Sequence, residues 1–407
     1  APDAVSLALA DTKKVVLGPS SWRWTKKSID AVVNPGDLIY VIHSLDGLLL
    51  AQLPEIDGAL VSLNPHDGAV LALVGGFDFA RNKLNHVTQA LRQPGSNIKP
   101  FIYSAALDNG FSAASMVSAA PIVIEDTLGN TWKPENYNKK FFGPTRLRRA
   151  LSLSLNLVSV RITRSLGIPL VTDHLERFGF SRDRLSTGLS LALGSASTTP
   201  MEIARGYAVF ANGGYLIEPY FIARIENRDG RIVRYANHTI LCPACRPNQS
   251  PSVQIGSGII RDRRYARRAI SPENAYLMTS LMNEVMTTGT GRKSLSLGRT
   301  DLSGKTGTTN NFRDAWFTGF NHDITASVWV GFDQPKELGR RESGSRAALP
   351  IWIDYMTIAL KDKPIHPATI PENIVVARIN RHSGQVTDLT DPDGIDEYFV
   401  MGSEPQA

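Results

Sequence analysis

Two nearly continuous apolar runs, separated by the turn dipeptide Asp67-Gly68, constrain the fold more than any other feature. The runs are GALVSLN at residues 58–64 and AVLALVGG at residues 69–76. Asp-Gly between two apolar runs indicates a β-hairpin. Runs with so few polar residues are typical of strands buried on both faces, in the middle of a sheet covered by helices. We therefore expect a layered domain in which other segments supply the covering helices.

The rest of the chain supplies such helices and further strands. Apolar residues at helical spacing predict helices at residues 96–110, 146–167, 199–214, 271–289 and 347–360. Three short runs at residues 301–308, 314–320 and 325–333 predict an antiparallel meander. The chain from residue 372 onward reads as a hairpin-like tail with an acidic end, DPDGIDE, at residues 391–397. The order of strands, helices, strands and one helix predicts an α+β domain with one sheet built from both ends of the segment.

Residues 1–57 are expected to form a separate small β module. KKVVL, DLIYVIHS and GLLLAQLP are short apolar or alternating runs, with Asp46-Gly47 as a turn between the last two. The predicted organisation is therefore 1–57, a main domain at 58–365, and a C-terminal tail at 366–407.

The composition is that of a globular protein, and it excludes several classes of function. The net charge is +6, but the arginines are scattered apart from one cluster at residues 261–268, and no nucleic-acid-binding motif accompanies them. We expect a solvated basic loop there and no nucleic-acid partner. No apolar run approaches the length of about 18 residues needed to cross a membrane. The N-terminal residues lack the features of a signal peptide, and the abrupt start suggests a piece of a longer protein.

Cys242 and Cys245 are the only cysteines, in the sequence LCPACRP. Such a pair can be half a zinc site, a redox pair, a local disulfide or two free thiols. Zinc needs about four ligands, and only His238 lies near in sequence. The Pro-rich loop also lacks the βαβ context of a thioredoxin-type pair. We favour a disulfide, and we expect no metal and no cofactor.

Three motifs that carry chemistry occur in order along the chain. They are Ser96-x-x-Lys99, Ser154-x-Asn156 and Lys305-Thr306-Gly307, and no other lysine has a serine three residues before it. Each motif is weak alone, because a plain helix turn or a polar turn explains it. Together they match the motif set of serine β-lactamases and penicillin-binding proteins.

Elementary chemistry gives these residues compatible roles. Residues three apart on a helix share a face, so Lys99 can reach the Ser96 hydroxyl, and a helix N-terminus favours a developing alkoxide there. A serine hydroxyl needs a base, and a lysine can serve only when its pKa is lowered. Lys305 is the candidate cation that lowers the pKa of Lys99, and Ser154 could relay the proton to the leaving amine.

The sequence resembles the class A, bifunctional penicillin-binding proteins of Gram-negative bacteria, most closely their 1A type. The segments that carry the resemblance are LVSLNPHDGAVLALVGG, RQPGSNIKPFIYSAAL, TPMEIARGYAVFANGG and GKTGTTNNFRDAWFTGF, within residues 58–360. It implies an α+β transpeptidase fold similar to that of serine β-lactamases: a central antiparallel sheet with helices on both faces and an all-helical subdomain. A partial OB-like β module would precede it.

The resemblance also implies a reaction, a serine-type D-Ala-D-Ala transpeptidation with carboxypeptidase activity as a side reaction. Ser96 would attack the D-Ala-D-Ala bond of a peptidoglycan stem peptide, with Lys99 as the base and Ser154 and Lys305 assisting proton transfer. The implied substrate-binding residues are Asn156, Thr306, Gly307 and Thr308. Thr306 and Thr308 would bind the terminal carboxylate, and the N–H groups of Ser96 and Thr308 would form the oxyanion hole. An amine of a second stem peptide would resolve the ester into a cross-link.

The implied partners are stem peptides of lipid II-derived glycan strands, β-lactam antibiotics that acylate Ser96, and periplasmic or outer-membrane activator proteins. The implied location is the periplasmic face of the bacterial inner membrane. Full-length family members carry a membrane helix and a glycosyltransferase domain, and neither is recognisable in this sequence.

Two alternatives differ in class. A class A β-lactamase needs a glutamate that activates water for deacylation, and no Glu-x-x-x-Asn-type loop lies between Ser154 and Lys305. A non-catalytic binding module, with Ser96 only capping its helix, does not account for the other two motifs. A Gly-x-Ser-x-Gly elbow, the mark of another class of serine hydrolase, is absent from the sequence.

Overall fold

In a computed structural model, the protein divides into two compact units. The structure describes residues 4–8, 14–44, 47–125, 129, 131–137, 139–236, 238–242, 252–255, 259–262 and 264–405. The first unit spans Ala1–Glu55 and the second Ile56–Ala407. The division expected from the sequence, 1–57, 58–365 and 366–407, stays a prediction.

The first unit contains two antiparallel hairpins. Strand β1 (Val5–Ala8) pairs with β2 (Lys14–Leu17), and β3 (Tyr40–Ser44) pairs with β4 (Gly47–Ala51). The sequence predicted β2, β3 and β4 but not β1, and Asp46 of the expected turn lies outside the described residues. A small core of Leu17, Trp22, Ile29 and Leu50 closes this unit.

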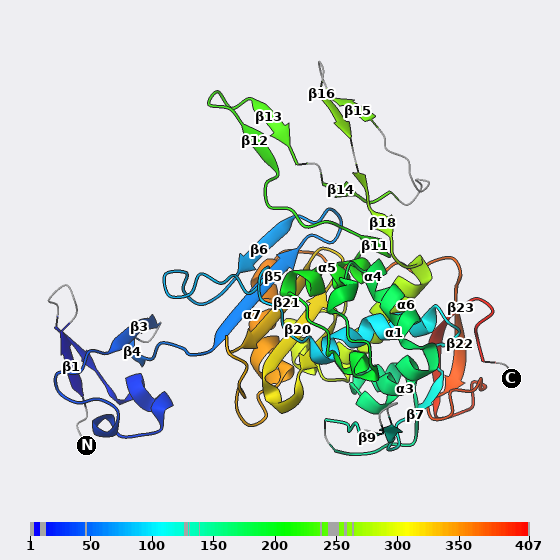
Figure 1. Cartoon of the computed structure of the whole chain (residues 1–407), viewed down its shortest axis with the longest axis horizontal. Helices are drawn as coiled ribbons and strands as arrows, with labels where there is room; N and C mark the ends of the chain where they lie inside the picture. Colours follow the sequence, from blue (N-terminus) through cyan, green and yellow to red (C-terminus); the bar gives the residue numbers. More distant parts are fainter. Residues whose placement is uncertain are drawn as a thin grey trace. The chain divides into compact units, whose positions relative to one another are not determined.

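The second unit is built on one five-stranded antiparallel sheet, as the sequence predicted. Its order is β19-β20-β21-β5-β6, so strands from both ends of the segment lie side by side (Figure 1). The bounds are β19 Ser303–Thr308, β20 Asp314–Phe320, β21 Thr325–Gly331, β5 Asp57–Leu63 and β6 Val70–Val74. Strand β5 pairs with β21 in a register that sets Leu63 opposite Thr325.

The prediction that both hairpin strands are central was half wrong. Strand β5 lies between β21 and β6, whereas β6 is an edge strand in which Leu71 and Val74 are about half exposed. The two runs are equally apolar, so only the neighbours distinguish them.

Helices cover both faces of this sheet. Because side chains alternate along a strand, Val61 packs into the larger core with α1, α5 and α6, and Leu60 packs into a second core with α7. The bounds are α1 Lys99–Leu107, α5 Pro200–Ala211, α6 Pro272–Thr287 and α7 Leu349–Ala359. Helix α5 begins with a capping box of Thr199 and Glu202, which the Thr-Pro signal in the sequence anticipates.

The long helix expected at residues 146–167 is in fact two helices. Helix α2 (Leu147–Ser152) ends before Ser154, and α3 (Asn156–Leu166) begins after it. Ser154 has a positive φ of 56°, a left-handed conformation that is uncommon for a residue other than glycine. A further helix, α4 (Ile168–Arg177), follows directly.

Part of the acidic segment DPDGIDE, residues 391–397, lies in a paired strand. It enters the last hairpin, where β22 (Ile374–Asn380) pairs with β23 (Gly394–Val400). Glu397 in β23 is 1% exposed, and Arg148 of α2 donates to it from Nε at 2.7 Å and from Nη2 at 2.6 Å. A buried carboxylate of this kind needs such a partner.

Short elements complete the described chain. The paired strands are β7 (Met116–Ser118) with β10 (Pro144–Arg146), β8 (Ile124–Glu125) with β9 (Thr131–Trp132), β11 (Tyr215–Leu216) with β18 (Arg267–Arg268), β12 (Arg224–Glu226) with β13 (Ile232–Tyr235), β14 (Thr239–Ile240) with β17 (Arg264–Tyr265), and β15 (Ser252–Ile255) with β16 (Ile259–Asp262). The short helices are η1 Pro19–Thr25, η2 Ile29–Ala31, η3 Gly95–Ile98, η4 Arg182–Arg184, η5 Leu189–Leu193, η6 Arg292–Leu297, η7 Asn310–Phe312 and η8 Gly344–Ala348.

Two further features considered in the sequence are the cysteine pair and membrane-spanning helices. Cys242 is disulfide-bonded, and its expected partner Cys245 lies outside the described residues. Among the residues that the structure describes, no helix combines the length and the apolar character needed to cross a membrane.

Candidate active site

Ser96 lies in the short helix η3, which leads directly into α1. The sequence placed the start of a helix at Ser96, and the structure forms a 3-10 turn there, with α1 beginning at Lys99. Ser96 is partly exposed, whereas Lys99 is fully buried. Gly95 has a φ of +53°, and a Cβ there would lie 2.6 Å from the Thr308 carbonyl oxygen. Only glycine allows the nucleophile turn to approach β19 this closely.

A second glycine closes the same contact from the β19 side. A Cβ at Gly307 would lie 2.5 Å from the Pro94 carbonyl oxygen and 2.8 Å from Cβ of Trp316. The indole N–H of Trp316 also donates to the Gln93 carbonyl at 2.8 Å, which ties β20 to the residues that precede Ser96. The glycine of Lys-Thr-Gly therefore has a steric reason, since it lets the strand and the serine turn touch.

The Lys99 ammonium is directed at the break between α2 and α3. Its Nζ donates to the Ser154 carbonyl at 2.7 Å and to Oδ1 of Asn156 at 2.7 Å, and lies 3.4 Å from Oγ of Ser154. Among the described residues, the partners of Lys99 are Ser154 and Asn156, so the contact with Ser96 that helix spacing allows is not made in this conformation. The left-handed backbone of Ser154 turns its carbonyl and its hydroxyl toward one amine.

Lys305 approaches the same serine from β19. Its Nζ donates to Oγ of Ser154 at 2.8 Å and to the Thr306 carbonyl at 3.1 Å, and its side chain is fully buried. Burial lowers the pKa of Lys305 to about 7. Burial, and after it the charge of Lys305, also lowers the pKa of Lys99 well below its usual value. Two amines with lowered pKa thus share one hydroxyl, which is an arrangement able to move a proton near neutral pH.

Asn156 starts α3 and is held by a residue that the sequence analysis missed. Oδ1 of Asn136 accepts from the backbone N–H of Asn156 at 2.9 Å and of Leu157 at 3.3 Å, and so caps α3 from a loop 20 residues away. The side-chain amide of Asn156 donates to the Glu135 carbonyl at 2.8 Å. A lone asparagine in a polar loop forms no pattern, so nothing in the sequence marks Asn136.

The threonines of β19 also have partners. Thr306 Oγ1 lies 2.7 Å from Oγ1 of Thr290, and Thr308 Oγ1 accepts from the backbone N–H of Gly344 at 3.1 Å. Thr290 and Gly344 are again residues that sequence reasoning missed. Thr306 is nearly buried and Thr308 is partly exposed, so a ligand lying along the outer edge of β19 would reach Thr308 more readily.

Two aromatic side chains meet near this group of residues. Tyr137, 61% exposed, contacts Phe312 edge to face with ring centroids 5.7 Å apart. Tyr137 follows the capping residue Asn136, and Phe312 lies in the connection between β19 and β20. The contact therefore links the loop that holds α3 to the strand that carries Lys305.

The structure thus brings Ser96, Lys99, Ser154, Asn156 and Lys305-Thr306-Gly307-Thr308 together from three separate segments. Residues 58–356 match the family described as the penicillin binding protein transpeptidase domain, which is well over half of the chain. The chain belongs to the penicillin-binding protein transpeptidase family.

The chain is similar in sequence to proteins named penicillin-binding protein 1A. The chain is 47% identical to penicillin-binding protein 1A of Pseudomonas aeruginosa over 92% of its own length and 49% of the relative's length. It is 38% identical to penicillin-binding protein 1A of Escherichia coli, over 99% of the chain and 55% of the relative. The chain therefore spans about half the length of these family members.

Solved structures agree with this assignment. The crystal structure of penicillin-binding protein 1A from Haemophilus influenzae has a TM-score of 0.92 and 38% identity, covering 100% of this chain and 62% of that one. PonA1 from Mycobacterium tuberculosis in complex with penicillin V has a TM-score of 0.63 and 25% identity, covering 79% and 82%. The α+β transpeptidase fold expected from the sequence is confirmed, and the family is that of transpeptidase enzymes.

Proposed function

We propose that this chain is a serine-type D-Ala-D-Ala transpeptidase that cross-links peptidoglycan stem peptides through an acyl-enzyme on Ser96. β-Lactams, which resemble the D-Ala-D-Ala terminus, acylate the same serine. The observation that carries the proposal is the convergence of two buried amines, Lys99 and Lys305, on Ser154 beside the nucleophile turn. Burying two lysines of like charge beside one another does not stabilise a fold, so a purely structural role does not account for this pair.

In acylation, Ser96 Oγ forms a bond to the carbonyl carbon of the penultimate D-Ala, and its proton passes to neutral Lys99. The oxyanion lies between the N–H groups of Ser96 and Thr308, in the place where Gly95 brings the turn against β19. The C–N bond then breaks, and the leaving amine takes a proton delivered through Ser154. Thr306 and Thr308 bind the carboxylate of the terminal D-Ala, and Lys305 assists proton transfer and the placement of charge.

In deacylation, an amine of a second stem peptide attacks the ester carbon and gives its extra proton to the base. The ester bond breaks, and Ser96 Oγ regains a proton. Water in place of the amine gives carboxypeptidase activity by the same route. Asn156 contributes hydrogen bonds to the donor peptide's backbone amide, once its own bond to Lys99 is exchanged.

The biological setting follows from the same proposal. The substrates are stem peptides of lipid II-derived glycan strands, and the location is the periplasmic face of the inner membrane. Periplasmic or outer-membrane proteins would act as activators of the full-length protein.

Labelled penicillin tests the nucleophile. Incubation followed by proteolysis and mass spectrometry should place one covalent adduct on the peptide that contains Ser96, and Ser96→Ala should abolish it. Ser383→Ala, a change of the same kind in the exposed turn of the C-terminal hairpin, should leave labelling unchanged. An adduct on another residue would refute the mechanism, and loss of the adduct within seconds would indicate a β-lactamase.

A further inference from the structure

A cluster of histidines lies at the end of the sheet remote from the candidate active site. Thr308 pairs with Ala315 at one end of β20, and Phe320 lies at the other end, roughly 20 Å away for a strand of this length. His322 and Asp323 form the turn that follows Phe320. His366 comes from the segment after α7, more than 40 residues later in the chain.

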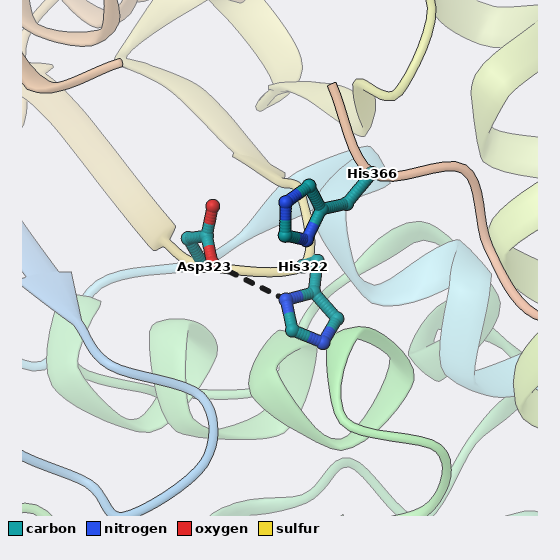
Figure 2. Close-up of side chains that lie close together, drawn as sticks. All are labelled: His322, Asp323 and His366. Carbon is teal, nitrogen blue, oxygen red and sulfur yellow. Dashed lines mark hydrogen bonds and ion pairs between the residues drawn. The ribbon is translucent and has the colours of Figure 1, made fainter. Parts of the chain in front are cut away.

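The three side chains of His322, Asp323 and His366 point toward one another (Figure 2). Their donor atoms, one from each residue, all lie within 4.8 Å of one another. His322 Nδ1 and Asp323 Oδ1 are 3.2 Å apart. Two adjacent ligands of a tetrahedral zinc ion, with bonds of about 2.0–2.2 Å, are separated by about 3.3 Å. Rotation of the exposed His322 ring and the half-buried His366 ring is enough to close the remaining gap.

The backbone that carries these side chains is held in place by a buried ion pair. Arg299 donates to Asp301 at 2.9 Å and 2.7 Å, and the Asp301 side chain is fully buried. Asp301 then accepts from the His366 backbone N–H at 3.2 Å and from the Asn321 amide at 3.3 Å. Arg299 also donates to the carbonyls of Lys363 and Pro364. The Arg299–Asp301 pair therefore holds both the segment of His322 and the segment of His366. Less conformational entropy would then be lost when an ion binds between them.

A fourth residue supports the turn. His66, in the β5–β6 turn, donates from Nε2 to the His322 carbonyl at 2.9 Å, and the two rings lie 4.5 Å apart. Asn321 Oδ1 accepts from the backbone N–H groups of Asp323 and Ile324 at 3.1 Å and 2.9 Å. These contacts hold the backbone of the turn that carries His322 and Asp323.

We infer that His322, Asp323 and His366 form a binding site for a divalent transition-metal ion, best filled by Zn²⁺. Two imidazoles and one carboxylate are the ligand types that zinc prefers, whereas Mg²⁺ and Ca²⁺ prefer oxygen ligands only. His322 and His366 line a cavity of about 460 Å³, which gives room for water at the remaining coordination position. The bound ion would join the β20–β21 turn to the segment that leads into the C-terminal hairpin.

The other group of similar composition does not offer an open site. His86, with Asp57 and Asp333, has Nδ1 2.7 Å from the Gly75 carbonyl and Nε2 2.6 Å from Asp333. Both ring nitrogens are thus engaged within the protein. The sequence analysis expected no metal, and the spacing of the ligands at 322–323 and 366 carries no recognisable signal.

Isothermal titration of the metal-free chain with ZnCl₂ tests the inference. We expect one equivalent of Zn²⁺ to bind, a rise in the melting temperature, and no comparable effect of MgCl₂. His366→Ala and His322→Ala should each weaken zinc binding at least tenfold. His382→Ala, which removes an exposed histidine of the C-terminal hairpin, should not change it.

Co²⁺ provides a second readout that distinguishes this site from the cysteines. Bound Co²⁺ should give the weak visible bands of nitrogen and oxygen ligands without thiolate charge-transfer absorption, and His366→Ala should remove them. Zinc binding that is unchanged in both histidine variants, or no binding at micromolar Zn²⁺, would overturn the inference. Penicillin labelling of Ser96 should persist in all three histidine variants, so the outcome is independent of the proposed reaction.

Discussion

Replacing Gly307 with alanine should slow acylation of Ser96 about a hundredfold in a protein that still folds. An ordinary contact to Cβ is about 3.4 Å, and the new Cβ would lie 2.5 Å from the Pro94 carbonyl and 2.8 Å from Trp316. Strand β19 and the nucleophile turn must therefore separate by roughly 1 Å. A misplacement of about 1 Å at a catalytic group can cost about a hundredfold in rate.

The same change should cost about 1–3 kcal/mol of stability, the usual range for overpacking a tight site. The acylation rate constant can be measured with a fluorescent penicillin, and the free energy of unfolding by chemical denaturation. Gly143→Ala is the matched control, because nothing lies within 4 Å of a Cβ at that position. Acylation of Gly307→Ala within threefold of the wild-type rate would refute the steric argument, as would an equal loss in the control.

Three further predictions concern charge and capping. The acylation rate should increase with pH because Lys99 must be neutral to act as the base. Burial and then the charge of Lys305 lower the pKa of Lys99, so Lys305→Gln should move the rising part of the pH–rate profile to higher pH. A profile that does not move in this variant would contradict the prediction. Glu397→Gln should lower the free energy of unfolding, measured with denaturant, by about 3–5 kcal/mol, because it leaves the buried charge of Arg148 unpaired. The control Asp396→Asn changes an exposed neighbour and should lower it by less than about 1 kcal/mol. Asn136→Ala should lower the free energy of unfolding by about 1–2 kcal/mol, because α3 loses its cap, and should slow acylation of Ser96. An unchanged free energy of unfolding and an unchanged acylation rate would show that water replaces the cap.

The sequence was sufficient to propose the catalytic residues because three motifs occur in one order. The structure brings Ser96, Lys99, Ser154 and Lys305 close together, and their catalytic roles stay a prediction. Helices of the same domain were predicted from periodicity and end signals, most clearly α5 with its Thr-Pro start. Each motif and each helix end signal lies within one short segment, so that segment alone is enough to predict it.

What the sequence could not predict depends on contacts between distant segments. The break at Ser154 interrupts an apolar pattern that continues on both sides, and it is stabilised by Lys99 and Lys305 from elsewhere in the chain. The cap of α3 by Asn136 leaves no sequence signal for the same reason. Whether β6 is central or at the edge depends on which strand pairs with it, and its composition does not decide this.

The pairing of β5 with β21 has a consequence for the order in which the protein can fold. Leu63 and Thr325 are opposite one another although about 260 residues separate them in the chain. At a synthesis rate of about 5–20 residues per second, β21 emerges roughly 13–50 seconds after β5. During that interval β6 can cover one edge of β5 at once, but the other edge has no strand to pair with. Folding of the sheet is therefore a late and slow event, and an unpaired apolar strand is the point at which a nascent chain would aggregate.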